Sequence, residues 1–261
     1  MRRLDARITT IIAWLGLALM AASFILLALQ PAPLAPRQIS GHKRAEPFAL
    51  VVLDPGHGGA DSGAMAGGLL EKDLTLDIVQ RLERLLGTQG VATLMTRIGD
   101  SYVTLADRAA LANRAKDAIF VSIHLNEGAR PMASGVETYF ASQQTTGAPR
   151  LASWLPFLQT IANDQPNVES QSLAGFIQQE LVTQTRANNR GTKAEQFYVL
   201  SNVHHPAALV EGGFLTNKDD IGKLSDANYR EEMAAAICSG IMKYRETLKQ
   251  RTQITAKSQA E

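Results

Sequence analysis

The sequence predicts an α/β fold, a three-layer sandwich with a central, mostly parallel sheet flanked by helices. Two observations lead to this prediction. Short apolar runs alternate with longer stretches in which apolar residues recur at helical spacing, a pattern typical of α/β proteins. Several runs are apolar throughout, as expected for strands covered on both faces. The 261 residues are enough to bury a core in one large domain or two small ones.

The predicted elements follow one another within residues 48–248. The first strand is FALVVL, and the amphipathic helix after it ends at Gly90. The later predicted strands are VATLMT, AIFVSI, GVETYF, FYVL and AALV. The later predicted helices cover about 104–116, 172–187 and 229–248. In such sheets, functional residues gather at the carboxyl ends of the strands.

The chain divides into four parts by composition. Residues 1–30 form a signal-anchor or signal peptide, 31–47 a proline-rich linker, and 48–248 the globular domain, with a polar tail at 249–261 that we expect to be disordered. The formal net charge is +1 and no basic block is present, so nucleic acid is not an expected partner. The single cysteine, Cys238, excludes an internal disulfide and fits a buried structural thiol.

The N-terminal segment predicts export. Arg2, Arg3 and Arg7 precede an uncharged run at residues 8–29. A helix of this length spans about 30 Å, roughly one bilayer core. No small-x-small cleavage site follows, which favours an uncleaved membrane anchor over a cleaved signal peptide. In either case the arginines stay cytoplasmic and the remainder of the chain is exported.

Candidate site residues stand where predicted strands end. His57 follows FALVVLD, His124 follows AIFVSI, Glu211 follows AALV, and Glu71 begins the first helix. The glycines around His57 do not form a phosphate loop, because no lysine follows at the required distance and Asp61 occupies the last position of a G-x-G-x-x-G pattern. Two imidazoles and one carboxylate suit zinc with an open fourth position, although spacing alone also leaves a simple glycine turn possible.

A string of motifs between residues 51 and 244 strengthens the metal interpretation. The motifs are DPGHGGADSGA, GLLEKDLTLDI, TRIGDSYVTLADRAALAN, FVSIHLN, GVETYF, NRGTK and ALVEGGFLTN. In this order they resemble the zinc-dependent N-acetylmuramoyl-L-alanine amidases, which are bacterial cell-wall hydrolases. The resemblance implies an α/β sandwich, in agreement with the hydrophobic pattern.

The resemblance also implies the site and the reaction. His57, Glu71 and His124 would bind one Zn²⁺ per chain, and Glu211 would be the catalytic acid–base. The implied reaction is hydrolysis, by zinc-activated water, of the amide bond between the lactyl group of N-acetylmuramic acid and L-alanine of the stem peptide. Peptidoglycan is the implied partner, met in the periplasm or on the extracytoplasmic side of the envelope. Asn126 is a candidate substrate contact.

Neighbouring polar residues have simpler expected roles. Arg97 and Arg108 are expected to form ion pairs that support the fold. Asp61 is expected to order the glycine loop or to hold a ligand from behind. His204 and His205 are expected to lie in a loop.

An insert at about 141–171 separates GVETYF from the next helix. Its apolar residues Leu151, Trp154, Leu155, Leu158 and Ile161 share one helical face. Some members of the resembling family carry an inhibitory insert here, so we hypothesise a lid that a protein activator removes. Asp164 and Glu169 are the candidate carboxylates for blocking zinc. The alternative is a surface helix packed on the edge of the sheet.

Other functions remain open at this point. The ligand set alone also fits another zinc peptidoglycan peptidase acting on the stem peptide, although the full motif string argues against it. A non-catalytic wall-binding module predicts the loss of a ligand or of Glu211, and all four residues are present. An envelope protein that recruits partners through the insert is compatible with catalysis.

Overall fold

The computed structural model describes residues 46–128, 132–144 and 167–258. The predicted anchor at 8–29 and most of the predicted insert, including its apolar face, lie outside these residues. Within the described ranges, no helix combines the length and the apolar character needed to cross a membrane.

A six-stranded sheet forms the centre of the domain, in the order β4-β1-β5-β8-β6-β7. Its strands are β1 (Leu50–Pro55), β4 (Ala92–Met95), β5 (Ala118–Asn126), β6 (Val136–Phe140), β7 (Asn189–Ala194) and β8 (Ala207–Phe214). The first four strands in the sheet order are parallel to one another. Strand β6 runs antiparallel to β8 and parallel to β7. The prediction of a mostly parallel sheet is therefore confirmed.

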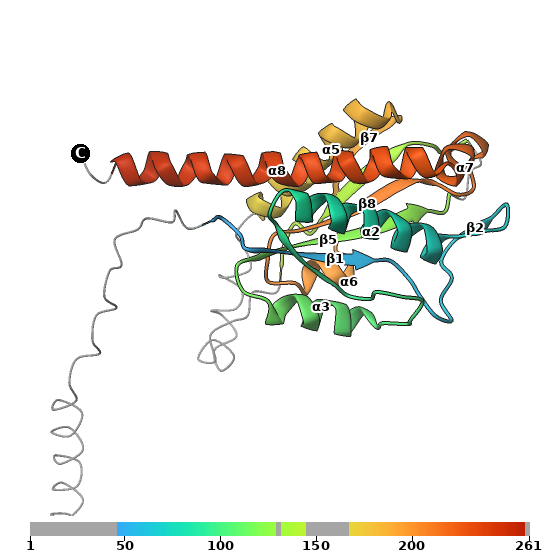
Figure 1. Cartoon of the computed structure of the whole chain (residues 1–261), viewed down its shortest axis with the longest axis horizontal. Helices are drawn as coiled ribbons and strands as arrows, with labels where there is room; N and C mark the ends of the chain where they lie inside the picture. Colours follow the sequence, from blue (N-terminus) through green and yellow to red (C-terminus); the bar gives the residue numbers. More distant parts are fainter. Residues whose placement is uncertain (1–45, 129–131, 145–166, 259–261) are drawn as a thin grey trace, which may run out of the picture. The chain divides into compact units, whose positions relative to one another are not determined.

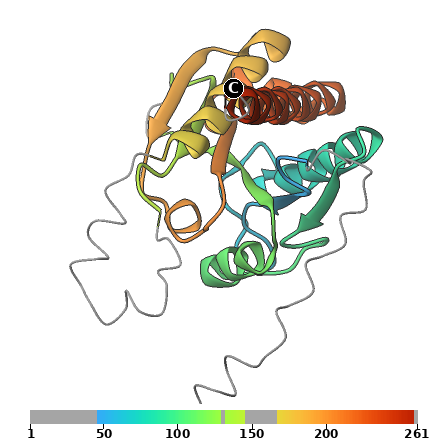
Figure 2. The same cartoon turned by 90° about the vertical axis from the view of Figure 1, so that its left-hand side faces the viewer.

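Helices cover both faces of this sheet (Figures 1 and 2). One face carries α2 (Glu71–Thr88), α5 (Val168–Thr185) and α8 (Ala227–Ser258), and the other carries α3 (Leu105–Arg114) and α6 (Tyr198–Ser201). The fold is the predicted three-layer sandwich.

The two faces explain why the first strand is apolar throughout. Val51 and Leu53 belong to the larger core cluster, whereas Val52 belongs to the smaller one on the opposite face. Successive side chains of a strand point to opposite faces, so a strand with two covered faces needs apolar residues at every position. Cys238 of α8 is buried and unpaired, as predicted.

Two of the predictions need correction. FYVL, predicted as a strand, lies largely in the short helix α6, which buries Val199 and Leu200. A run of four apolar residues carries no period that separates a strand from a helix. Helix α8 continues to Ser258, so the expected disorder of the polar tail is wrong up to that residue.

Four elements were missed. The edge strand β7 has the sequence NRGTKA and is mostly exposed, so it lacks a hydrophobic signal. A small hairpin joins β2 (Met65–Ala66) to β3 (Leu69–Leu70). Helix α7 (Lys218–Ser225) begins after Asn217, whose side chain accepts from two backbone amides as an N-cap.

Candidate metal centre

Three of the predicted site residues converge from separate elements. His57 lies in the loop after β1, Glu71 is the first residue of α2, and His124 lies in β5. One ligand atom from each lies within 4.8 Å of the others. Glu71 Oε1 is 3.1 Å from His57 Nε2 and 2.9 Å from His124 Nδ1. The two imidazole rings meet edge to face, with centroids 4.8 Å apart.

The loop that carries His57 has an unusual backbone. His57 has φ +58°, a left-handed conformation that is uncommon for a residue with a side chain. Arg108 holds this turn, because its Nη2 donates to the His57 carbonyl at 2.7 Å. Backbone strain of this kind persists only where the surroundings enforce it, and it is concentrated at functional sites.

The two arginines support the fold in different ways. Arg108 Nη1 pairs with the buried carboxylate of Asp54 at 2.7 Å, which confirms the expected ion pair. The expectation for Arg97 is wrong among the described residues. Its guanidinium donates to the backbone carbonyls of Pro55 and Gly56, so it braces the end of β1 without a carboxylate partner.

Asp61 makes contacts that fit both roles expected of it. Its Oδ1 accepts from the Gly63 amide at 3.1 Å, which orders the loop. Its Oδ2 lies 2.9 Å from His57 Nδ1. This contact fixes the ring with Nε2 directed at Glu71, the arrangement in which a carboxylate behind a metal-ligating histidine sets its tautomer. Burial lowers the pKa of His57, but the carboxylates of Glu71 and Asp61 outweigh it and raise the pKa overall.

Glu71 is buried as an anion. Burial alone would raise its pKa, but hydrogen bonds from His124 and His57 lower it well below the usual range. The Leu125 amide donates to Oε1 and the Ala64 amide to Oε2, both at 2.9 Å. The carboxylate is thereby held in one orientation from both sides.

The cluster fits zinc in chemistry and in spacing. Bond lengths of about 2.0–2.1 Å around a tetrahedral ion place neighbouring ligand atoms about 3.3 Å apart, close to the observed contacts to Glu71 Oε1. The loop is also shaped around these side chains. A Cβ at Gly63, which has φ +64°, would lie 2.5 Å from Glu71 Oε2 and 2.6 Å from the His57 ring.

Glu211 lies on the strand beside His124. Glu211 is outside the three-residue cluster, but it is the register partner of His124, with Glu211 on β8 and His124 on β5. Its Oε2 is buried and has no hydrogen-bond partner among the described residues. Burial, followed by the nearby charges of Glu71 and Glu137, raises the pKa of Glu211 well above its ordinary value. A buried carboxyl with a raised pKa beside a possible metal site is suited to accept and return a proton.

A second group of polar residues surrounds Glu137 on β6, and of these the sequence reasoning assigned only Asn126, as a candidate substrate contact. Glu137 is 2% exposed and is the register partner of Glu211. It accepts hydrogen bonds from Asn126, Tyr139, Arg190 and Lys193. The available signal was a glutamate inside the predicted strand GVETYF, followed later by two cations in the motif NRGTK.

The remaining predictions fall elsewhere. His204 and His205 lie in the loop before β8, as expected. Glu169 does not belong to the cluster of His57, Glu71 and His124, and it pairs instead with Arg251 of α8 and accepts from the Tyr244 hydroxyl. Asp164 lies outside the described residues.

The ends of the insert are held together. The Asn167 amide donates to the Ser142 carbonyl at 3.3 Å, and Asn167 Nδ2 donates to the Ala141 carbonyl at 2.9 Å. The chain therefore leaves and re-enters the domain at one point.

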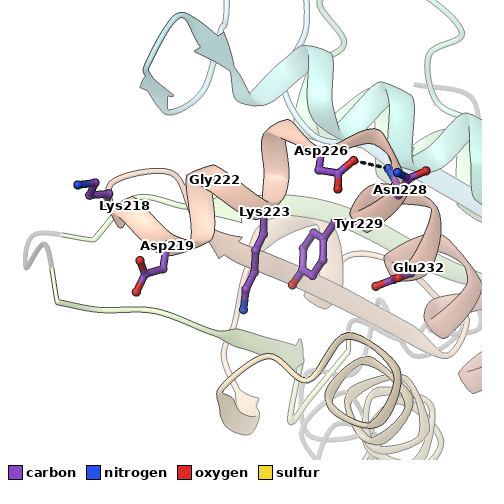
Figure 3. A pocket seen from close by; sticks show the side chains of 8 residues that line it. All are labelled: Lys218, Asp219, Gly222, Lys223, Asp226, Asn228, Tyr229 and Glu232. Atoms are coloured by element: carbon purple, nitrogen blue, oxygen red, sulfur yellow. Dashed lines mark hydrogen bonds between the residues drawn. The ribbon is translucent and has the colours of Figure 1, made fainter.

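A hollow lies between α7 and the start of α8 (Figure 3). Lysine and carboxylate side chains line it, and Lys223 lies over the Tyr229 ring at 5.9 Å. None of the four predicted site residues contributes to its lining.

Comparison with known proteins identifies the family. The family model of N-acetylmuramoyl-L-alanine amidase matches residues 51–243. The uncharacterized protein YqiI of Bacillus subtilis is 36% identical over 88% of this chain and 97% of its own length. The amidase LytC of the same organism is 33% identical over 74% of this chain, but the match spans only 35% of LytC.

Solved structures agree with the sequence comparisons. An N-acetylmuramoyl-L-alanine amidase from Clostridium difficile 630 superposes with a TM-score of 0.65 at 32% identity, over 76% of this chain and 97% of that one. The CwlD amidase of Clostridioides difficile, solved in complex with the GerS lipoprotein, gives 0.65 at 29% identity, over 76% and 99%. Fold, motif positions and relatives agree, and the chain belongs to the N-acetylmuramoyl-L-alanine amidase family.

Proposed function

We propose that the protein is a zinc amidase that cuts the amide bond between the lactyl group of N-acetylmuramic acid and the first L-alanine of the stem peptide. The observation that carries the proposal is the convergence of His57, Glu71 and His124, with Glu211 as the neighbour of His124 in the sheet. Family membership supports the substrate, and the cluster supports the metal.

In this proposal the three clustered residues hold one zinc ion. When bound, zinc supplies Lewis acidity, which polarises a carbonyl group and makes water a better nucleophile at neutral pH. Asp61 keeps His57 in the tautomer that presents Nε2. The amides of Leu125 and Ala64 keep the Glu71 carboxylate in place.

Glu211 moves the proton in the proposed reaction. Its Oε2, which has no other partner among the described residues, takes a proton from the attacking water. The same oxygen then returns the proton to the amine of L-alanine as the amide bond breaks, so one carboxyl acts first as base and then as acid. Its position on a central strand fixes the carboxyl relative to His124.

We further propose that the enzyme acts outside the cytoplasm and stays attached to the membrane. The support is the arginine-flanked apolar run at residues 8–29 and the location of peptidoglycan outside the membrane.

We also propose that the insert receives a protein activator. The support is that Ser142 and Asn167, which flank residues 145–166, are joined by a hydrogen bond, and that the related CwlD was solved with the GerS lipoprotein.

The decisive experiment is digestion of purified peptidoglycan with the full-length chain, followed by mass spectrometry of the released fragments. We expect free stem peptides that begin at L-alanine, and we expect their loss with a chelator and in Glu211→Gln. Glu246→Gln, which changes an exposed carboxylate of α8, is the matched control and should leave the products unchanged.

The product pattern separates the competing functions. Fragments cut within the stem peptide would overturn the substrate assignment in favour of a peptidase. Binding to peptidoglycan without any cleavage, in a zinc-loaded chain from which residues 145–166 have been deleted, would support a wall-binding module instead.

A further inference from the structure

A cavity lies next to Glu137, the strand neighbour of Glu211, and is not used by the proposed chemistry. It measures about 580 Å³, and its lining includes Asn126, Glu137, Tyr139, Arg190, Lys193 and Phe214. Glu137 connects it to the catalytic centre, because its register partner on β8 is Glu211. Directly opposed residues of an antiparallel pair have Cβ atoms about 4.5–5.5 Å apart, so the cavity begins one side chain away from the proposed proton carrier.

A bulge in β7 brings two cations to the same side of the sheet. Residues 190 and 193 would point to opposite faces of a regular strand. The register shifts here, because Val136 pairs with Asn189 whereas Thr138 pairs with Thr192, which inserts one extra residue in β7. Gly191 has φ +80° and makes this irregularity possible. As a result, Arg190 Nε and Lys193 Nζ both donate to Glu137 Oε2.

Arg190 is held by two contacts and has N–H donors that no described residue uses. Its Nε is 2.8 Å from Glu137 Oε2, and its guanidinium carbon lies 4.8 Å from the centre of the Phe214 ring. Within the described part of the chain, neither Nη1 nor Nη2 of Arg190 has a hydrogen-bond partner. A guanidinium that contacts a carboxylate and an aromatic ring, and whose two NH2 groups have no partner among the described residues, is suited to bind a carboxylate in a bidentate manner.

The second cation is placed in the same way. Lys193 uses one donor on Glu137 and lies over the Tyr139 ring at 5.6 Å. Glu137 is one carboxylate shared by two cations, so the group around it carries one excess positive charge. Glu127 also lines the cavity, but it is exposed and forms no ion pair with either cation among the described residues.

We propose that Arg190 and Lys193 form a carboxylate-binding subsite that selects acidic stem peptides, with Glu137 as the residue that positions both cations. The identity of the ligand as a stem peptide rests on the proposed function. A peptide released from its glycan always carries a terminal carboxylate and can carry a side-chain carboxylate, and either has the chemistry that this subsite recognises. The subsite would therefore select substrates by their stem peptide, which is the leaving group, at a distance from the amide bond that is cut.

The test first compares the affinities of different peptides for the wild-type protein, and then compares protein variants. Synthetic peptides that begin at L-alanine and contain an acidic residue are titrated into the full-length chain by calorimetry. One peptide has both carboxylates free, one has only the terminal carboxylate amidated, one has only the side-chain carboxylate amidated, and one has both amidated. Amidation of the recognised group should weaken binding roughly 10-fold or more, because hydrogen bonds between charged groups are lost. The amidated position that matters identifies the carboxylate.

Variants then assign the effect to the two cations. In Arg190→Gln the free and amidated peptides should bind within twofold of each other. Lys193→Gln should reduce the discrimination without abolishing it, and it keeps the proposal testable if Arg190→Gln melts at a lower temperature. Glu127 lines the same cavity, and Glu127→Gln removes an anion while it keeps both cations. This variant should therefore retain the full difference in affinity between free and amidated peptides.

Two results would overturn the subsite. One is a wild-type protein that binds free and fully amidated peptides equally, or that binds neither at millimolar concentration. The other is discrimination that survives in Arg190→Gln. Failure of the proposed amidase function gives a different result, namely intact peptide discrimination without cleavage of any muramoyl-peptide.

Discussion

His124 on β5 and Glu211 on β8 are register partners in the parallel part of the sheet. Partners on adjacent strands project from the same face, so one strand supplies a candidate ligand and the next supplies a candidate proton carrier. Immediately after His124 the register of β5 shifts, and Asn126 pairs with Phe214. Irregularities of this kind re-aim side chains and occur next to active sites.

Glu211→Gln should abolish most of the hydrolysis while leaving metal binding intact. The amide cannot accept and return a proton, and the loss of a general acid–base typically costs about 10²- to 10⁴-fold in rate. Release of peptide from peptidoglycan, measured beside zinc content, checks this prediction. An unchanged rate in Glu211→Gln would remove Glu211 from the mechanism, whereas a parallel loss of zinc would make it a ligand.

His124→Ala should lose zinc. The purified wild type should contain one zinc per chain by elemental analysis, and activity lost on chelation should return when zinc is added. His205→Ala is the matched control, because its ring lies in the loop before β8 and contacts the Ala115 carbonyl. Equal zinc content in the two variants would contradict the proposed ligand set.

Asp61→Asn should weaken zinc binding without abolishing it. The carboxylate fixes the His57 ring from behind, and removal of such a partner typically costs about 10- to 100-fold in metal affinity. Competition with a zinc indicator measures the change. Asp219→Asn, an exposed residue in the first turn of α7, is the control. Unaltered affinity in Asp61→Asn would limit Asp61 to ordering the glycine loop.

The grouping of the three ligand candidates and Glu211 could largely be predicted because the strands of a parallel sheet end at the same edge. Strands that run in one direction end at one edge, so His57, His124 and Glu211 could be grouped from sequence once the strands were recognised. The choice of Glu71 as the third ligand candidate required the family resemblance, since helical spacing alone does not direct a first-turn carboxylate into the sheet.

The second polar group could not be predicted, for physical reasons. Its cations lie on β7, an exposed edge strand without a hydrophobic pattern. Their common side depends on the bulge at Gly191, and regular alternation would have separated Arg190 from Lys193. From the sequence, Glu137 would be interpreted as a polar residue in a half-exposed strand. The two cations that compensate its buried charge come from more than fifty residues away in the chain.

Glu211→Gln should stabilise the metal-free protein, and the effect should grow with pH. Glu211 has a raised pKa in the folded state because of burial and of nearby carboxylates. A carboxyl whose folded pKa is raised holds its proton more tightly in the folded state, so stability falls as pH rises from the ordinary carboxyl pKa through the folded value. Glutamine removes this charge. At pH 8 we expect a gain on the order of 1 kcal/mol, the scale of an unsatisfied buried polar group.

Thermal melts of metal-free wild type and variant at pH 4.5 and pH 8 measure this gain. A difference of 1 kcal/mol shifts the melting temperature by about 2–4 °C in a domain of this size. The shift should shrink at pH 4.5, where both side chains are neutral, and when zinc is restored, because a cation compensates the carboxylate. Glu246→Gln should show no comparable pH dependence. A shift of equal size at both pH values would contradict the charge explanation.

Gly63→Ala should disrupt the metal cluster, and Gly68→Ala separates the two possible causes. Both glycines have positive φ, at +64° and +80°, so alanine introduces backbone strain at each. Only at Gly63 would the new Cβ meet the Glu71 carboxylate and the His57 ring, whereas nothing lies within 4 Å at Gly68. We therefore expect both variants to melt at lower temperature and only Gly63→Ala to lose zinc and peptide release. If the two variants lost zinc equally, backbone strain alone would explain the result. The close packing of Gly63 against Glu71 and His57 would then not affect zinc binding.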